Sequence, residues 1–319
     1  MNLLEERDYY KPFNYPWAFE YYKQQQHMHW LPDEVNLADD LRDYREKMSD
    51  GNKKLLTQIF RFFTQADVDV CCGYAKHYLP TFKQPEVRMM LSAFAAMEAV
   101  HQEAYSLLLE TLGFRDDEYQ KFFEHKEMLD KHEYLGNFGM GTPMDIAKTM
   151  AIYSAFTEGV QLFSSFAILL NFPRHNLMKG MGQIVTWSVR DETLHVEGMS
   201  HLFRSFIQEN PALWTDDLKY EIYCAAERTV DLEDAFINLC FEGAEVPDLT
   251  AEEIKEYIRY IADRRLLGLG MKKIFGSDVN PLPWLDYMLN GVEHTNFFEN
   301  RATEYSRAST TGNWKDIFK

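Results

Sequence analysis

Apolar residues recur at intervals of three and four along most of this chain, which is the spacing that places them on one face of an α-helix. The pattern predicts six long helices, over residues 55–78, 87–112, 144–170, 178–206, 218–240 and 254–274. No stretch alternates convincingly with a period of two, so we expect no β-strand. Several of the predicted helices exceed 20 residues, a length that is typical of a helical bundle.

Proline and glycine separate the predicted helices. Pro80 and Gly113 end the first two. The third helix is expected to begin at Thr142 and Pro143, because threonine is a good cap and proline fits the first turn. Pro173 follows that helix. The boundaries therefore agree with the apolar periodicity.

Two segments at the ends depart from the pattern. Residues 1–30 are rich in aromatic side chains, and we expect them to wrap the bundle as an irregular arm. Residues 301–319 are polar, and we expect a flexible tail beyond a single helical domain of residues 1–300. Three apolar side chains lie near the end of that tail: Trp314, Ile317 and Phe318. Apolar residues in such a tail indicate that a partner binds them.

Composition narrows the class of protein. Hydrophobic residues make up 46% of the 319 residues and charged residues 26%, which predicts a large core and excludes a disordered chain. The formal net charge of −17 argues against a surface for nucleic acid, which needs basic residues to neutralise phosphates. No uninterrupted apolar run approaches the ~20 residues of a membrane span.

The cysteines and the N-terminal segment indicate the cellular compartment of the protein. The acidic N-terminal segment lacks the apolar stretch of a signal peptide. The cysteines form no C-x-x-C motif and are expected to be buried thiols: Cys71, Cys72, Cys224 and Cys240. We therefore expect a cytoplasmic protein with reduced thiols.

Two short motifs carry the chemistry. Glu98 and His101 form an E-x-x-H, and Glu192 and His195 form another. Residues three apart share a helix face, so each motif presents a carboxylate beside an imidazole. A single E-x-x-H is weak evidence, but two of them in long apolar helices are the pattern of a two-metal site in a bundle core.

Two further acids lie about one helical hairpin upstream of the motifs. Asp67 precedes Glu98 by 31 residues, and Glu158 precedes Glu192 by 34. Both stand in strongly apolar helices, where an unpaired carboxylate is costly. Four carboxylates supply a charge of −4, which two divalent cations balance. Carboxylate-rich ligation with histidine suits iron or manganese, whereas zinc favours more His or Cys.

Tyr105 is the candidate for oxidation by such a metal pair. It lies one helical turn after His101 and two turns after Glu98 on the same face. A tyrosine on the buried face of a helix usually serves only as a large packing residue whose hydroxyl forms a hydrogen bond. Beside two redox metals it becomes a plausible radical site.

These residues resemble the small, radical-generating β subunit of class I ribonucleotide reductase, and the resemblance covers nearly the whole chain. Further strings match the family's motifs: residues 30–35 (WLPDEV), 190–195 (RDETLH), 280–284 (NPLPW) and 295–299 (TNFFE). The resemblance implies an all-α, ferritin-like helical bundle with a two-metal carboxylate site in its core. The metal ligands map onto the six residues found above: Asp67, Glu98, His101, Glu158, Glu192 and His195.

The resemblance also assigns roles outside the ligand set. It places the radical on Tyr105 and a hydrogen-bonded route from metal to surface on Trp30, Asp191 and His101. It implies a homodimer whose tail carries a radical relay, Tyr305, and docks on a large subunit that reduces ribonucleotides. The resemblance implies that the substrate is a ribonucleoside diphosphate or triphosphate.

Alternatives of other classes remain at this point. Around Tyr105 the family's pocket maps onto Leu162, Phe166 and Ser188, and Ser188 and Cys71 make it more polar than usual. A metal-centred oxidant without a stable tyrosyl radical is therefore an alternative. Others are a ligand-binding oxidase of the same fold, a ferritin-like iron store and a scaffold bundle. The oxidase has no need of the aromatic-tipped tail, the iron store does not need Trp30, Asp191 and Tyr105 in register, and the scaffold has no reason to bury six ligands.

Overall fold

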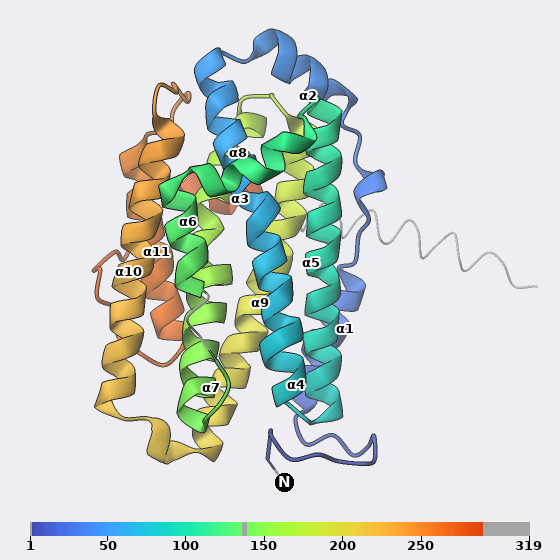
Figure 1. Ribbon diagram of the computed structural model, residues 1–319, viewed down its shortest axis with the longest axis vertical. Helices are drawn as coiled ribbons and strands as arrows, with labels where there is room; N and C mark the ends of the chain where they lie inside the picture. The colour runs from blue at the N-terminus through green and yellow to red at the C-terminus, as the bar shows by residue number, and fades with distance from the viewer. Residues whose placement is uncertain (1, 136–138, 290–319) are drawn as a thin grey trace, which may run out of the picture. The chain divides into compact units, whose positions relative to one another are not determined.

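The structure is a computed structural model that describes residues 2–135 and 139–289 (Figure 1). Within these ranges the chain forms helices and no strand, as predicted. The α-helices are α1 (Pro16–His27), α2 (Ala38–Arg42), α3 (Asp50–Gly73), α4 (Leu79–Thr81), α5 (Pro85–Leu112), α6 (Lys126–Leu135), α7 (Pro143–Thr149), α8 (Phe163–Arg174), α9 (Lys179–Glu209), α10 (Asp216–Phe241) and α11 (Ala251–Gly268). Segments of 3₁₀ or π helix lie between them: η1 (Pro32–Glu34), η2 (Asp43–Lys47), η3 (Tyr74–Tyr78), η4 (Asp116–Glu124), η5 (Met150–Gln161) and η6 (Pro211–Leu213).

Four helical rods form the core of the bundle: α3, α5, α9, and the continuous run of α7, η5 and α8 (Figure 1). Helix α3 packs against α5, and η5 packs against α9. Helices α10 and α11 cover η5 on one side, whereas α1 lies against α5 and α9 on the other. This arrangement directs the inner faces of four rods toward one central region.

Two of the predicted boundaries are confirmed by local geometry, whereas Pro80 lies inside the short helix α4 and does not end a helix. The side chain of Thr142 accepts a hydrogen bond from the amide of Asp145, and Pro143 occupies the first turn of α7. Gly113 ends α5 with a φ of 87°, a conformation that glycine adopts without steric cost. Pro173 differs from prediction, because it stands in the last turn of α8 and not beyond it.

The prediction of a wholly irregular N-terminal arm is wrong. Residues 16–27 form helix α1, which begins with proline in its first turn. The segment before α1 is fixed to α5 through the buried carboxylate of Glu86, which pairs with Arg7 at 2.9 Å. The same carboxylate accepts the backbone amides of Asn14 and Tyr15 at 2.6 and 2.8 Å. The many aromatic residues hid the helical pattern of α1, and the position of this helix depends on contacts with distant residues such as Glu86.

The last predicted helix is shorter than expected. Helix α11 ends at Gly268, six residues before the predicted end. Gly270 has a φ of 82°, and this left-handed conformation cannot continue a right-handed helix. Residues 282–289 belong to a separate compact unit, in which the backbone is helical from 283 to 289. Residues 301–319, the predicted tail, lie outside the described residues.

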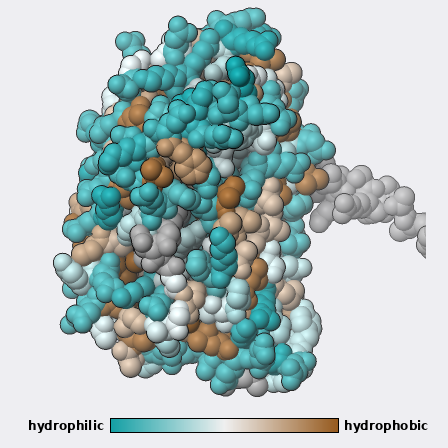
Figure 2. All heavy atoms as spheres, viewed as in Figure 1, coloured by the Kyte–Doolittle hydropathy of each residue, from teal (hydrophilic) through white to brown (hydrophobic). Residues whose placement is uncertain are grey.

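The run from Pro143 to Arg174 has the length and apolar composition of a membrane-spanning helix. Its most apolar window is entirely buried within the bundle, as in the core helix of a globular fold. All twelve residues of η5 are buried. By contrast, the face in Figure 2 is mainly hydrophilic with scattered apolar side chains, in keeping with the high charge of the chain.

Candidate dimetal site

Six side chains singled out from the sequence lie in the centre of the bundle. Helix α3 supplies one, α5 two, η5 one and α9 two. Each is at most 2% exposed: Asp67, Glu98, His101, Glu158, Glu192 and His195. The i, i+3 spacing in α5 and α9 places each carboxylate beside its imidazole.

Five of these side chains form two overlapping groups of metal-binding character. One group is Glu98, His101 and Glu192, and the other is Glu158, Glu192 and His195, with the potential ligand atoms of each group within 4.8 Å of one another. Glu192 belongs to both. Glu98 also reaches both imidazoles, because its oxygens lie 3.5 Å from Nδ1 of His101 and 2.9 Å from Nδ1 of His195.

Asp67 lies outside both groups. Its carboxylate still feels the charges of His101, Glu98 and Glu192, which act on its pKa. The structure thus brings the sixth residue into the same buried region, although it belongs to neither group.

The site residues leave polar atoms without hydrogen bonds, which is costly in a protein core. These buried atoms are Oδ2 of Asp67, both carboxylate oxygens of Glu98 and Glu192, Oε1 of Glu158 and Nδ1 of His195. Although Nδ1 of His195 is 2.9 Å from Glu98, the two atoms are not aligned as donor and acceptor. Oxygen and nitrogen atoms that converge without hydrogen-bond partners fit two divalent cations, and the oxygen-rich set fits iron or manganese.

Burial and mutual charge shift the acids in opposite directions. Burial raises the pKa of Asp67 well above its usual value. Burial also raises the pKa of Glu158, and neighbouring carboxylates add to the effect. Burial opposes the ionised form of Glu98 as well, but contact with the imidazoles of His101 and His195 lowers its pKa to about 2. The metal-free site therefore favours protons on two of its acids.

Neighbouring carboxylates raise the pKa of both imidazoles and so favour their protonated forms. Burial opposes charging His195, yet its contacts with Glu192 and Glu98 raise its pKa to about 10. Burial likewise opposes charging His101, and Asp191 together with the same two glutamates raises its pKa well above the usual value. Protons on the imidazoles thus offset carboxylate charge where metal ions are absent.

A buried hydrogen-bond network lies behind the imidazoles. The indole Nε1 of Trp30 donates to Oδ2 of Asp191 at 2.8 Å, and the same oxygen lies 3.3 Å from Nε2 of His101. Gln25, from α1, donates to Asp191 at 3.2 Å and lies 3.0 Å from Nε2 of His195. The three residues predicted as a route are therefore connected, and Gln25 links them to the second imidazole.

Sequence reasoning missed two residues of this site. Gln25 is one of three consecutive glutamines in a segment predicted to be irregular, so no pattern marked it. Tyr74, in η3, donates its hydroxyl to Oε2 of Glu158 at 2.9 Å. Tyr74 follows Asp67 by two helical turns, the same spacing that drew attention to Tyr105, and this signal was available.

Tyr105 occupies a closed, mainly aromatic pocket. Its ring stacks on Phe63 with centroids 4.5 Å apart, and Phe63 in turn contacts Phe166. Its hydroxyl donates to Oγ of Ser188 at 3.3 Å. Burial, followed by the charge of Asp67, raises the pKa of Tyr105, so its neutral phenol is favoured.

Cys71, the other polar side chain expected near Tyr105, has its Sγ 3.9 Å from the carbonyl of Ala95. All four cysteines are free thiols, as expected, but the prediction that they are buried is confirmed only for Cys240, because the other three are partly exposed. The tail residues predicted to relay the radical and bind a partner, Tyr305 with Trp314, Ile317 and Phe318, lie outside the described residues.

Four helical rods that surround paired carboxylates and histidines define a ferritin-like protein with a dimetal carboxylate site. Comparison with known families extends this: the family "ribonucleotide reductase, small chain" matches residues 7–281. The chain belongs to that family. It is the small subunit of a ribonucleotide reductase, the β subunit of an oxidoreductase.

Individual relatives agree. A probable ribonucleoside-diphosphate reductase small subunit of Invertebrate iridescent virus 6 is 46% identical, over 100% of this chain and 99% of the relative. The ribonucleoside-diphosphate reductase subunit beta of Chlamydia pneumoniae is 30% identical, over 93% and 89% of the two chains.

Solved structures share the fold at low identity. The ribonucleotide reductase R2 subunit from Clostridium botulinum superposes with a TM-score of 0.78 at 22% identity, covering 86% of this chain and 89% of that one. The Rnr4 homodimer from Saccharomyces cerevisiae gives 0.76 at 18% identity, over 95% and 92%. Dimanganese(II)-NrdF from Streptococcus sanguinis gives 0.73 at 22% identity, over 86% and 96%.

Proposed function

We propose that two redox metal ions bind the six buried side chains at the centre of the bundle: Asp67, Glu98, His101, Glu158, Glu192 and His195. The observation that carries the proposal is the set of buried oxygen and nitrogen atoms that have no hydrogen-bond partner there. Four carboxylates and two divalent cations have compensating charges. Glu192 belongs to both groups and would help to hold either ion.

Substitution of single ligands tests the assignment. Glu98→Ala and Glu192→Ala should each lose at least one metal ion per chain, measured by elemental analysis or anomalous scattering. Glu103→Ala is the matched control, because Glu103 lies on the same helix as Glu98 but is exposed. Retention of wild-type occupancy by both ligand variants would show that the assignment is wrong.

The metals are iron or manganese. Oxygen-rich ligation with one histidine for each metal suits either. The related NrdF from Streptococcus sanguinis was solved in a dimanganese(II) form, which supports including manganese. Elemental analysis of the purified protein, combined with an EPR spectrum after activation, distinguishes the metals.

When bound, the metals would reduce an oxidant and supply a one-electron oxidation inside the core. We assign the resulting radical to Tyr105. Phe63 covers one face of its ring, and Ser188 accepts the phenolic proton in a hydrogen bond. The buried pocket excludes water from the ring and keeps the neutral phenol as the resting form.

The contact with Ser188 favours a second candidate mechanism for the same enzyme. In this mechanism the oxidant stays on the metals, and no stable tyrosyl radical forms. A hydroxyl beside the phenol oxygen makes this pocket more polar than a purely apolar one. An organic radical signal after activation supports the first candidate. A fully active enzyme without that signal supports the second.

Transfer of the radical to the large subunit would use Trp30, Asp191 and His101. Their hydrogen-bonded contacts connect the site to the segment between α1 and η1. We further propose that residues 301–319 form the tail that docks on the large subunit, with Tyr305 as the relay. The family and the homodimeric yeast neighbour support a homodimer as the working form. We expect this assembly to act in the cytoplasm.

A further inference from the structure

The helix that carries Glu158 is not α-helical. Residues Met150–Gln161 form η5, a π-helix of twelve residues, whereas most π-helices are single-turn bulges. Its backbone hydrogen bonds join residues five apart, whereas those of an α-helix join residues four apart. Where the two kinds of helix meet, some backbone groups therefore lose their normal helical partner. All of η5 is buried, and water does not reach its backbone to compensate.

A guanidinium from another helix satisfies the backbone next to Glu158. Arg265, on α11, donates from Nε to the carbonyl oxygen of Gly159 at 2.9 Å. The side chain then passes over Phe163, with the guanidinium carbon 4.8 Å from the ring centroid. No carboxylate in the described part of the chain pairs with Arg265, so this carbonyl is a principal polar partner of a largely buried cation.

The residue after Glu158 leaves room for this contact. A Cβ on Gly159 would lie 2.9 Å from Nε of Arg265 and 3.1 Å from its Cδ, closer than real side chains approach. Gly159 has no positive φ, so the close approach of Arg265, and not backbone conformation, accounts for glycine there. The glycine and the arginine thus form a matched pair.

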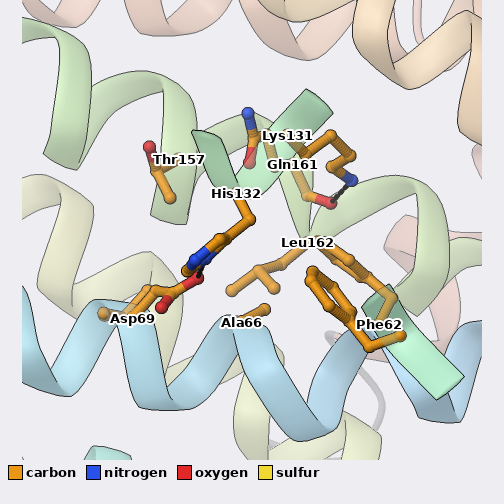
Figure 3. Close-up of a pocket in the computed structure, with 10 residues that line it drawn as sticks. Phe62, Ala66, Asp69, Lys131, His132, Thr157, Gln161 and Leu162 are labelled. Atoms are coloured by element: carbon orange, nitrogen blue, oxygen red, sulfur yellow. Dashed lines mark hydrogen bonds and ion pairs between the residues drawn. The ribbon is translucent and has the colours of Figure 1, made fainter. Parts of the chain in front are cut away.

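A second cation lies at the end of the same π-helix. Nζ of Lys131, from α6, lies 3.4 Å from the carbonyl oxygen of Gln161 (Figure 3). The buried carboxylate of Glu233 pairs with this lysine, and the ring of Phe62 lies 3.5 Å from its nitrogen. Two separate helices therefore direct cations at carbonyls of η5 just after Glu158.

Glu158 is held from the side-chain end as well. Tyr74 donates to its Oε2, which leaves Oε1 without a partner. Its orientation depends on two constraints: one on the carboxylate and one on the backbone that follows it. Loss of the backbone constraint would let η5 relax toward α-helical bonding and turn the carboxylate away from Glu192 and His195.

We propose that Arg265 is a positioning residue, which fixes the π-helical turn at Gly159 and thereby aims Glu158 at the cation position it shares with Glu192 and His195. The inference rests on the proposed dimetal site. It predicts that Arg265 affects one of the two cation positions much more than the other, because Glu158 belongs to only one of the two ligand groups.

Equilibrium titration of the metal-free full chain with Mn²⁺, with free Mn²⁺ followed by EPR, tests this. Arg265→Met keeps the apolar stem and removes the donor, and it should weaken one of the two sites by tenfold or more while changing the other by less than threefold. Gly159→Ala should give the same pattern, because its Cβ displaces the arginine. The double variant should bind Mn²⁺ no more weakly than either single variant, since both substitutions remove the same hydrogen bond between Arg265 and Gly159.

Arg264→Met is the matched control, because Arg264 is the exposed neighbour on the same helix and should leave both sites unchanged. Thermal unfolding of each metal-free variant reports on folding, and Arg265→Lys, which keeps the charge but not the Nε donor, replaces any variant that fails to fold. Equal affinities in wild type and Arg265 variants, or an equal loss at both sites, would overturn the positioning role. A wild-type chain that binds no Mn²⁺ pair would instead refute the dimetal site itself.

Discussion

Loading the metal-free protein with two divalent cations should release between two and four protons per chain. Metal ligands must be deprotonated, so any proton that the empty site holds must leave when the ions enter. The raised pKa values point to four groups that hold such protons: the imidazoles of His101 and His195, and the carboxyls of Asp67 and Glu158.

The lower figure of two protons comes from the imidazoles. The pKa of His195 is raised to about 10 and that of His101 lies well above its usual value, so both carry a proton at neutral pH. The upper figure of four adds Asp67 and Glu158, whose pKa values burial raises. With all four protons in place the site is electrically neutral, and two divalent cations restore neutrality once the protons have left.

The sign of the pH dependence follows from linkage. The metal-free state binds more protons than the loaded state, so lowering the pH weakens metal binding. If two protons are released, the overall association constant for both ions falls about 100-fold for each unit by which the pH is lowered. If four are released, it falls about 10,000-fold. The effect should extend up to about pH 10, where His195 loses its proton in the empty site.

Calorimetry in buffers of different ionisation enthalpy counts the protons directly. The apparent binding enthalpy of Mn²⁺ should vary linearly with buffer enthalpy, and the slope gives the number of protons released. Glu158→Gln should reduce that number by up to one, whereas Glu103→Gln, at an exposed position, should not change it. A slope near zero at neutral pH would refute the protonation scheme and the mutual charging of these residues.

Two further predictions concern the radical and its transfer. Tyr105→Phe should abolish an organic radical signal in EPR while two metal ions remain bound, because the ring packing is kept and only the hydroxyl contact with Ser188 is lost. Loss of metal from this variant, or an unchanged signal, would contradict the assignment. Deletion of residues 313–319 should weaken assembly with the large subunit, whereas Tyr305→Phe should leave binding intact and stop turnover, because phenylalanine has no oxidisable hydroxyl. Unchanged turnover of Tyr305→Phe at saturating large subunit would remove Tyr305 from the pathway.

Local periodicity was sufficient to predict the bundle and much of its centre. The E-x-x-H spacing places Glu98 beside His101 and Glu192 beside His195 wherever those segments are helical, and both segments are long and apolar. Asp67 followed from a different argument, that an acid in an apolar helix needs a charged partner. The structure buries all five, and Asp67 is the one that belongs to neither group of neighbouring ligand atoms.

Boundaries and distortions were harder to predict. The aromatic N-terminal segment concealed α1, because its apolar residues do not form a strong stripe and its position depends on contacts with distant helices. The apolar spacing of three and four does not reveal the π-helical path of η5, since all of its residues, polar and apolar alike, are buried. A uniformly buried segment has no polar face from which to read its period.

The residues that orient the ligands were invisible for a related reason. Gln25 reaches His195 across 170 residues of sequence, and Arg265 reaches the residue after Glu158 across 106. Such contacts are fixed by how α1 and α11 pack on the bundle, which no local spacing encodes. Gly159 gives a partial indication of the contact with Arg265. A glycine in a buried helix, next to a proposed ligand, indicates that another group approaches the backbone closely. The proposed ligand set therefore follows from helical spacing, whereas the contacts that we propose to orient it come from outer helices that contribute no ligand.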